Sequence, residues 1–149
     1  MARIRTIKPD FFRHYALYEA EVQARLPLRL AYAGLWTAAD REGRFPWAPN
    51  QLKLDCLPYD QHIDFSAVLE ALAFFEFVIR YEHNGKLYGY IPSWKDHQVI
   101  NAHEAKSRLP VPPPPQIESS ANTNQPLKLH VHAHALLANA RMEKEKERE

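Results

Sequence analysis

Cysteine and glycine are scarce in this chain, and neither sign of charge is in large excess. Its 149 residues include one cysteine, Cys56, and only four glycines. A lone cysteine cannot form an internal disulfide or a multi-cysteine zinc site, so we expect a protein of the reducing cytoplasm. The 19 basic and 18 acidic residues leave a net charge of +1 with histidine neutral. This balance excludes a polybasic protein that binds its partners through bulk charge.

Long apolar runs and catalytic motifs are missing as well. The longest apolar run, residues 30–36, is far shorter than the ~20 residues that cross a bilayer. The basic first residues also lack the apolar region of a signal peptide, so we expect no membrane partner. No glycine-rich phosphate loop or G-x-S-x-G motif occurs, and Asp55 disfavours a thiolate at Cys56. The sequence predicts a non-enzymatic protein without a cofactor.

A metal site is not expected either. His130, His132 and His134 alternate along the chain, and in a strand this spacing would place them on one face. No acid or cysteine occurs between residues 127 and 142 to complete a zinc site. We therefore interpret the three histidines as a fortuitous cluster.

The composition changes sharply near Lys106. All glycine, tryptophan, phenylalanine and tyrosine residues precede this point, and a proline-rich run begins at Leu109. Consecutive prolines cannot join a helix or a central strand, and they favour polyproline II. The sequence therefore predicts a folded domain over residues 1–106, a flexible linker over residues 107–126, and a charged, histidine-containing segment that is helical in part over residues 127–149.

Three segments of the domain carry apolar residues at helical spacing. They span residues 28–39, residues 49–57 and residues 65–75, and Asp64 is a good N-cap for the third. Between the first two, residues 44–47 are short and interrupted by proline, which allows at most an edge strand.

After the third helix the hydrophobic period changes to two. Residues 77–83 and 86–91 flank Asn84-Gly85, a dipeptide preferred in two-residue hairpin turns, and this turn would place Tyr81 opposite Tyr88. The order helix, short strand, helix, helix, hairpin predicts an α+β fold, a winged helix-turn-helix domain with a two-stranded wing. The alternative is another small α+β domain with a hairpin on a helical bundle.

Several segments of the domain match a family pattern. They are residues 2–12 (ARIRTIKPDFF), 34–36 (GLW), 39–44 (ADREGR), 79–81 (IRY), 84–88 (NGKLY) and 94–101 (WKDHQVIN). Together they resemble small bacteriophage and prophage proteins with a winged-helix DNA-binding domain, described as replication or replisome-organiser-like proteins. The resemblance covers residues 1–108. It implies DNA binding at a phage origin or regulatory site in the bacterial cytoplasm, with host or phage replication proteins as further partners.

Candidate DNA contacts are the cations of the N-terminal arm, of the wing and of the segments beside them. The first 13 side chains sum to +3, and a basic arm can enter the minor groove or bind phosphates. Double-stranded DNA is the expected partner, and single-stranded DNA is the alternative. The predicted DNA-binding residues are Arg3, Arg5, Lys8, Arg44, Lys53, Arg80, Lys86, Lys95 and His97.

The third helix differs from a DNA-reading helix because it holds no lysine or arginine. Arginine contacts to guanine are the commonest specific readout in the major groove, and glutamates repel phosphates. The alternative function is therefore a winged-helix module that recruits or inhibits a host protein without binding DNA. Its predicted partner-binding residues are Glu70, Phe74 and Glu76.

Overall fold

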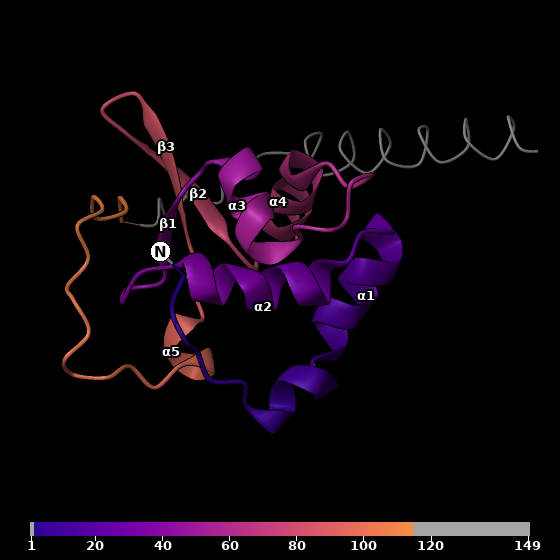
Figure 1. Cartoon of the computed structure of the whole chain (residues 1–149), viewed down its shortest axis with the longest axis horizontal. Helices are drawn as coiled ribbons and strands as arrows, with labels where there is room; N and C mark the ends of the chain where they lie inside the picture. Colours follow the sequence, from indigo (N-terminus) through magenta and orange to yellow (C-terminus); the bar gives the residue numbers. More distant parts are fainter. Residues whose placement is uncertain (1, 115–149) are drawn as a thin grey trace, which may run out of the picture. The chain divides into compact units, whose positions relative to one another are not determined.

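Helix α2 (Leu28–Ala38) is the central helix of the computed structural model, which describes residues 2–114 (Figure 1). The helix begins directly after Pro27 and ends at Ala39, where the backbone becomes extended. The first predicted helix is confirmed, because its predicted apolar residues are buried. These are Leu28, Tyr32, Leu35, Trp36 and Ala39.

Two further predicted segments lie beyond the described residues. They are residues 115–126 of the predicted linker and the histidine-containing segment 127–149.

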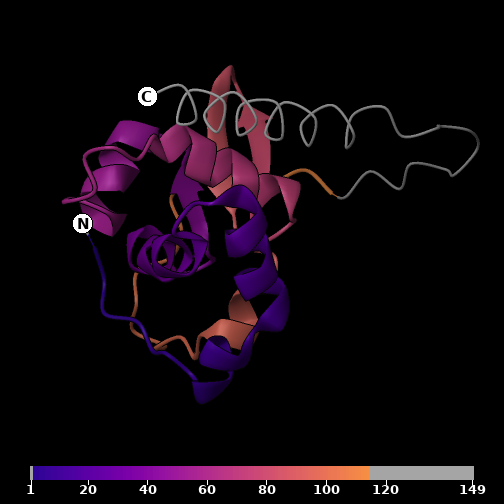
Figure 2. The same ribbon diagram turned by 90° about the vertical axis from the view of Figure 1, so that its right-hand side faces the viewer.

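Helices α3 (Pro49–Cys56) and α4 (Phe65–Phe74) lie on one side of α2, and the N-terminal arm lies on the opposite side in both Figure 1 and Figure 2. Pro49 occupies the first turn of α3, where a proline costs no hydrogen bond. Asp64 caps α4, since its carboxylate accepts a hydrogen bond from the Ser66 backbone N–H at 3.0 Å. Both helices form where the apolar spacing predicts them.

Within the described residues, three short strands form one antiparallel sheet in the order β1–β3–β2. They are β1 (Arg44–Pro46), β2 (Ile79–His83) and β3 (Lys86–Tyr90). The β2–β3 hairpin extends away from the helices (Figure 1). The sheet has one strand more than the predicted two-stranded wing, because the predicted edge strand pairs with β3.

Asn84 and Gly85 form the hairpin turn. Their φ angles of +51° and +76° lie in the left-handed region, which a type I′ turn requires at both central positions. The resulting register places Tyr81 opposite Tyr88, as the sequence predicts.

The two faces of the sheet have different neighbours. On one face, a Cβ added at Gly89 would lie 2.5 Å from a ring atom of Phe45, which is fully buried in the core. This face packs toward the helices. The other face carries Tyr81, Tyr88 and Tyr90, and we call it the tyrosine face.

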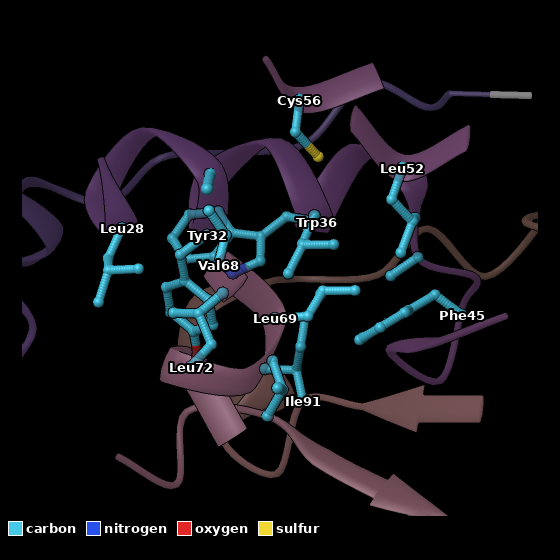
Figure 3. Close-up of a cluster of buried hydrophobic side chains, with 14 of the residues drawn as sticks. Leu28, Tyr32, Trp36, Phe45, Leu52, Cys56, Val68, Leu69, Leu72 and Ile91 are labelled. Atoms are coloured by element: carbon cyan, nitrogen blue, oxygen red, sulfur yellow. The ribbon is translucent and has the colours of Figure 1, made fainter. Parts of the chain in front are cut away.

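The core forms where α2, α3, α4 and the base of the sheet meet (Figure 3). Its aromatic centre is Trp36, whose ring lies 5.4 Å from that of Tyr32 and 5.0 Å from that of Phe11 in edge-to-face contacts. Helices α2 and α3 approach closely at Gly34, where an added Cβ would lie 2.9 Å from the Cα of Cys56. Glycine at position 34 therefore permits this approach.

Two helical elements before α2 were not expected from the sequence. They are the 3₁₀-helix η1 (Pro9–Arg13) and α1 (Tyr15–Ala24). Leu17 and Ala20 of α1 are buried, but Tyr15 on the same helix is 70% exposed. The apolar residues of α1 therefore do not gather on a single face, which removes the periodic signal of an amphipathic helix.

The folded unit also extends further than the predicted boundary at residue 106. Its last residue is Pro113, because residues 107–113 contact the sheet. The Tyr81 hydroxyl donates a hydrogen bond to the carbonyl of Pro110 at 2.8 Å. Prolines lack the N–H that a strand needs, but their carbonyls still accept hydrogen bonds. The proline-rich composition of residues 107–113 therefore gave no sign in the sequence that this segment is attached to the folded unit.

Candidate nucleic-acid interface

The cations of the β2–β3 hairpin are exposed to solvent. Arg80 lies in β2, and Lys86 begins β3 beside the turn. The register puts them on opposite faces, since Arg80 pairs with Gly89 whereas Lys86 pairs with His83. The guanidinium carbon of Arg80 lies 5.6 Å from the ring centroid of Trp47, a cation–π contact that orients its charge. The hairpin therefore presents a positive charge on each of its faces.

Three other predicted cations lie on separate elements. Lys53 is half-buried on α3, and Lys95 is exposed on the short helix α5 (Trp94–His97). Arg44 begins β1, and its Nη1 donates to the carbonyl of Leu109 at 3.4 Å. Lys53 and Lys95 are thus available to a ligand, whereas Arg44 is partly engaged by the chain itself.

Helix α4 presents acidic and apolar groups. Glu70 is exposed, while Phe74 is half-buried with its ring 5.0 Å from that of Phe75 in an edge-to-face contact. Glu76 is exposed just beyond the helix, in a left-handed backbone conformation with φ of +65°. Phe74 therefore contributes to packing, and Glu70 is the more accessible of the two helical residues predicted to bind a partner.

The basic N-terminal arm folds onto α2. The Arg3 backbone N–H donates to the carbonyl of Thr37 at 2.8 Å. Arg5 is engaged more deeply, because its Nε donates to the Trp36 carbonyl and its Nη2 to the Ala39 carbonyl, each at 3.0 Å. Only 6% of the Arg5 side chain is exposed. This burial conflicts with the predicted role of Arg5 as a DNA contact, so we omit Arg5 from the proposed interface.

Glu104 is the counter-charge of the arm. Its Oε1 and Oε2 each lie 2.8 Å from a guanidinium nitrogen of Arg5, and its Oε1 lies 3.4 Å from Nε of Arg3. Arg41 donates to the Glu104 backbone carbonyl at 3.1 Å. The hydrogen bond from Arg5 lowers the pKa of the Glu104 carboxyl, and partial burial opposes this effect. The carboxylate thus compensates the positive charge of the arm.

Trp94, which begins α5, and Gln98, which directly follows it, hold the arm in place. The Gln98 side chain accepts from the Thr6 backbone N–H at 3.0 Å and donates to the Thr6 carbonyl at 2.8 Å. Trp94 donates from Nε1 to the carbonyl of Arg41 at 2.8 Å, and its ring lies 5.0 Å from the guanidinium carbon of Arg5. A buried side chain that satisfies both backbone groups of one residue replaces the hydrogen bonds of a strand.

His97 is half-buried and packs against the core. Its ring stacks on Trp36 with centroids 4.8 Å apart, and its Nε2 lies 2.9 Å from the hydroxyl of Ser93. Burial and the neighbouring His14 lower the pKa of His97. His97 therefore supports packing, whereas Lys8 beside it stays exposed with its ammonium group hydrogen-bonded to a backbone carbonyl at 2.7 Å.

The structure thus separates the predicted DNA-binding residues. The arm residues gather where α2 ends and meets α5, while the hairpin cations stand apart from them (Figure 1). Sequence reasoning missed Glu104 and the clamping role of Gln98. The only signal for Gln98 was its place in the family-like segment 94–101, and Glu104 had none.

Comparison of the chain with protein-family models, curated proteins and solved structures gives no match. Among residues 2–114, no helix combines the length and the apolar character needed to cross a membrane. The same residues contain no cluster of three or more histidine, cysteine, aspartate or glutamate side chains that would hold a metal ion.

Proposed function

We propose that the domain is a winged helix that binds DNA, with the β2–β3 hairpin as its wing. The element order α2–β1–α3–α4–β2–β3 and the sheet order β1–β3–β2 are compatible with this fold. The observation that carries the proposal is the hairpin itself, which extends from the helices and exposes Arg80 and Lys86 (Figure 1). Cations on such a projection can contact phosphates without the body of the domain entering a groove.

The expected mode of binding relies on phosphates more than on bases. Helix α4, which corresponds to the recognition helix in this fold, offers no lysine or arginine for guanine. Lys95, which is exposed, and the half-buried Lys53 add to the charge of the hairpin. Phosphate contacts fix position but carry no sequence information, so we expect a modest sequence preference.

The resemblance of residues 1–108 to phage replication proteins supports a more specific proposal. In it, the domain acts in the initiation of phage DNA replication or in its regulation, within the bacterial cytoplasm. Duplex DNA is the proposed ligand, and host or phage replication proteins are the proposed partners.

The direct test is fluorescence anisotropy of the full chain with a labelled duplex and with a labelled single strand of the same length. Measurements at about 50 mM and about 200 mM salt report the number of phosphates contacted, because each contact adds about −0.9 to the slope of log K against log salt for duplex DNA. Phosphate contacts from Arg80, Lys86, Lys53 and Lys95 predict a slope of roughly −3 to −4. Absence of saturable binding at the lower salt would remove DNA from the proposed function.

A matched pair of variants locates the interface. The variant Arg80→Gln/Lys86→Gln removes both hairpin cations and is expected to reduce the slope by about 2. The control is Arg13→Gln, which removes an exposed cation from η1, away from the hairpin in Figure 1. An equal loss of affinity per removed charge in the hairpin variant, which loses two charges, and in the control, which loses one, would show that only overall charge matters.

Docking of a protein partner on α4 is the second candidate function, because the exposed surface of this helix is acidic and free of cations. Glu70→Lys reverses its exposed charge without disturbing the core. Capture of purified replication proteins by the wild type but not by this variant, with DNA affinity unchanged, would support it. Phe74→Glu is a poorer probe because Phe74 packs against Phe75.

A further inference from the structure

The tyrosine face of the sheet is covered by a segment that has no part in the proposed DNA interface. Residues 107–113, which we call the strap, pass over this face without forming a helix or a strand. Tyr81 shows the effect of the cover. It is only 5% exposed although it lies outside the main hydrophobic core.

Two side chains of the sheet donate hydrogen bonds to carbonyls of the strap. The Tyr81 hydroxyl donates to the Pro110 carbonyl at 2.8 Å. Beside it, Nη1 of Arg44 donates to the Leu109 carbonyl at 3.4 Å. Arg44 and Tyr81 therefore bind the strap through the backbone carbonyls of two successive residues.

Two prolines of the strap are less exposed than the residue between them. Pro110 and Pro112 are half-buried, while Val111 between them is 72% exposed. Pro112 borders a hollow of about 370 Å³ that Tyr90 and Trp94 also line. The two prolines thus face the domain, and a space beside the second one is left unfilled.

The platform beneath the strap is aromatic. The ring of Tyr81 stacks on Tyr88 with centroids 5.6 Å apart and meets Tyr90 edge-to-face at 5.9 Å. Burial raises the pKa of the Tyr81 hydroxyl, so this group remains a donor throughout the physiological pH range.

These features match the physics of polyproline recognition. A polyproline II segment has no internal hydrogen bonds, so its carbonyls are free to accept bonds from a receptor. Its conformation is set by the proline rings before binding, which reduces the entropy lost. Grooves lined by aromatic side chains exploit both properties to bind proline-rich peptides.

We propose that the tyrosine face, with Arg44, is a recognition site for a proline-rich peptide, occupied here by the chain's own strap. The partner is a protein whose exposed segment carries the pattern apolar–Pro–apolar–Pro, as residues 109–112 do. This segment competes with the strap and extends into the hollow beside Pro112. The site lies on the opposite face of the sheet from Arg80 and on the same face as Lys86, which stands beside the turn.

Competition with the strap sets the conditions of the test. A tethered segment acts at an effective concentration of the order of millimolar, so a free peptide binds the wild-type chain weakly. The probe is a fluorescent peptide with the sequence of residues 107–114, Ser-Arg-Leu-Pro-Val-Pro-Pro-Pro. The receptor is the full chain with Pro110→Ala and Pro112→Ala, which weakens its own strap. We expect saturable binding with a Kd below about 1 mM, and at least tenfold weaker binding to the wild type.

The hydroxyl of Tyr81 provides the specific control. Tyr81→Phe, made in the strap-weakened chain, keeps the ring but removes the donor, and should weaken peptide binding by about three- to tenfold. Tyr88→Phe is the matched variant, since the Tyr88 ring contributes to the stack while the Tyr81 hydroxyl makes the bond to the strap. It should leave the affinity within about twofold. Equal affinities for all three receptors would overturn the proposal.

Two further experiments test the proposed peptide site. If circular dichroism shows that the strap-weakened chain is unfolded, the wild-type chain is titrated with excess peptide and followed by NMR. Displacement of the strap then shifts the Val111 amide resonance, and an unchanged resonance overturns the proposal. A concentration-dependent dimer of the wild type that excess peptide dissociates would assign the site to the strap of a second copy and overturn the assignment to a partner protein.

Discussion

Arg5 and Glu104 lie 99 positions apart in the sequence and form a two-point ion pair, with both guanidinium–carboxylate distances at 2.8 Å. Each side chain is largely buried, with 6% of Arg5 and 14% of Glu104 exposed. The pair joins the arm to the segment after α5, and Arg5 also donates to the carbonyls of Trp36 and Ala39 at the end of α2. The basic arm, which the sequence predicts as a DNA-binding segment, is thus tied to the domain through Arg5.

Loss of the Glu104 carboxylate should destabilise the domain. Glu104→Gln leaves the buried Arg5 charge without its partner, and we expect a loss of about 1.5–3 kcal/mol in the free energy of unfolding. Chemical denaturation followed by tryptophan fluorescence measures it. Glu21→Gln is the matched control, because Glu21 pairs with the more exposed Arg29, and an exposed pair contributes only about 0–1 kcal/mol. Equal effects of the two variants would contradict a special role for the Arg5 pair.

The same carboxyl should make stability depend on acid. Its pKa in the folded protein is lowered from the ordinary value of 4.5, so folding favours the charged form. This contribution is fully present above pH 4.5 and is lost as the pH falls through the lowered pKa. Unfolding free energies measured between pH 6 and pH 3 should therefore decline more in the wild type than in Glu104→Gln. Parallel curves would show that another group controls the acid response.

Gly34→Ala tests the contact between α2 and α3. An alanine inside a helix is ordinarily more favourable than glycine by about 1 kcal/mol. Here the new Cβ would lie 2.9 Å from both Cα and Cβ of Cys56, so the helices must separate. We expect a net destabilisation of about 1–3 kcal/mol in thermal or chemical unfolding. An unchanged or higher melting temperature would mean that the two helices can move apart freely.

The thiol of Cys56 should be unreactive in the folded protein. Burial, with a smaller effect from the charge of Asp55, raises the pKa of Cys56 to about 12. Because the thiolate is the reactive form, labelling by iodoacetamide at pH 8 should be roughly a thousandfold slower in the native chain than in the unfolded chain. Comparable rates with and without denaturant would show that Cys56 is accessible.

Local pattern was sufficient for the elements that bury one continuous face. The spacing of Leu28, Tyr32 and Trp36 predicted α2, and Asn84-Gly85 predicted the turn and its register. Helix α1 escaped detection because exposed Tyr15 and Tyr18 interrupt its apolar face. Periodicity reports only on the contrast between buried and exposed sides, and α1 has little of it.

The candidate site was harder to predict than the fold, because the charge of a side chain does not show which group of the folded protein it contacts. Arg5 and Arg80 are equally basic in the sequence, but Arg5 meets Glu104 inside the domain while Arg80 is exposed over Trp47. Whether an arginine is available to a ligand depends on contacts between residues distant along the chain. No local pattern contains that information.

The sequence by itself determined the α+β class, the positions of α2, α3 and α4, the hairpin turn and the low thiolate character expected for Cys56. These follow from periodicity, from backbone preferences and from the neighbouring charge, all of which act over a few residues. Only the tertiary structure decided that the arm is tied to Glu104 and Gln98, and that the proline-rich strap rests on Tyr81. Each of these contacts joins segments distant in sequence, and its formation depends on how the packed helices and sheet bring the two partners together.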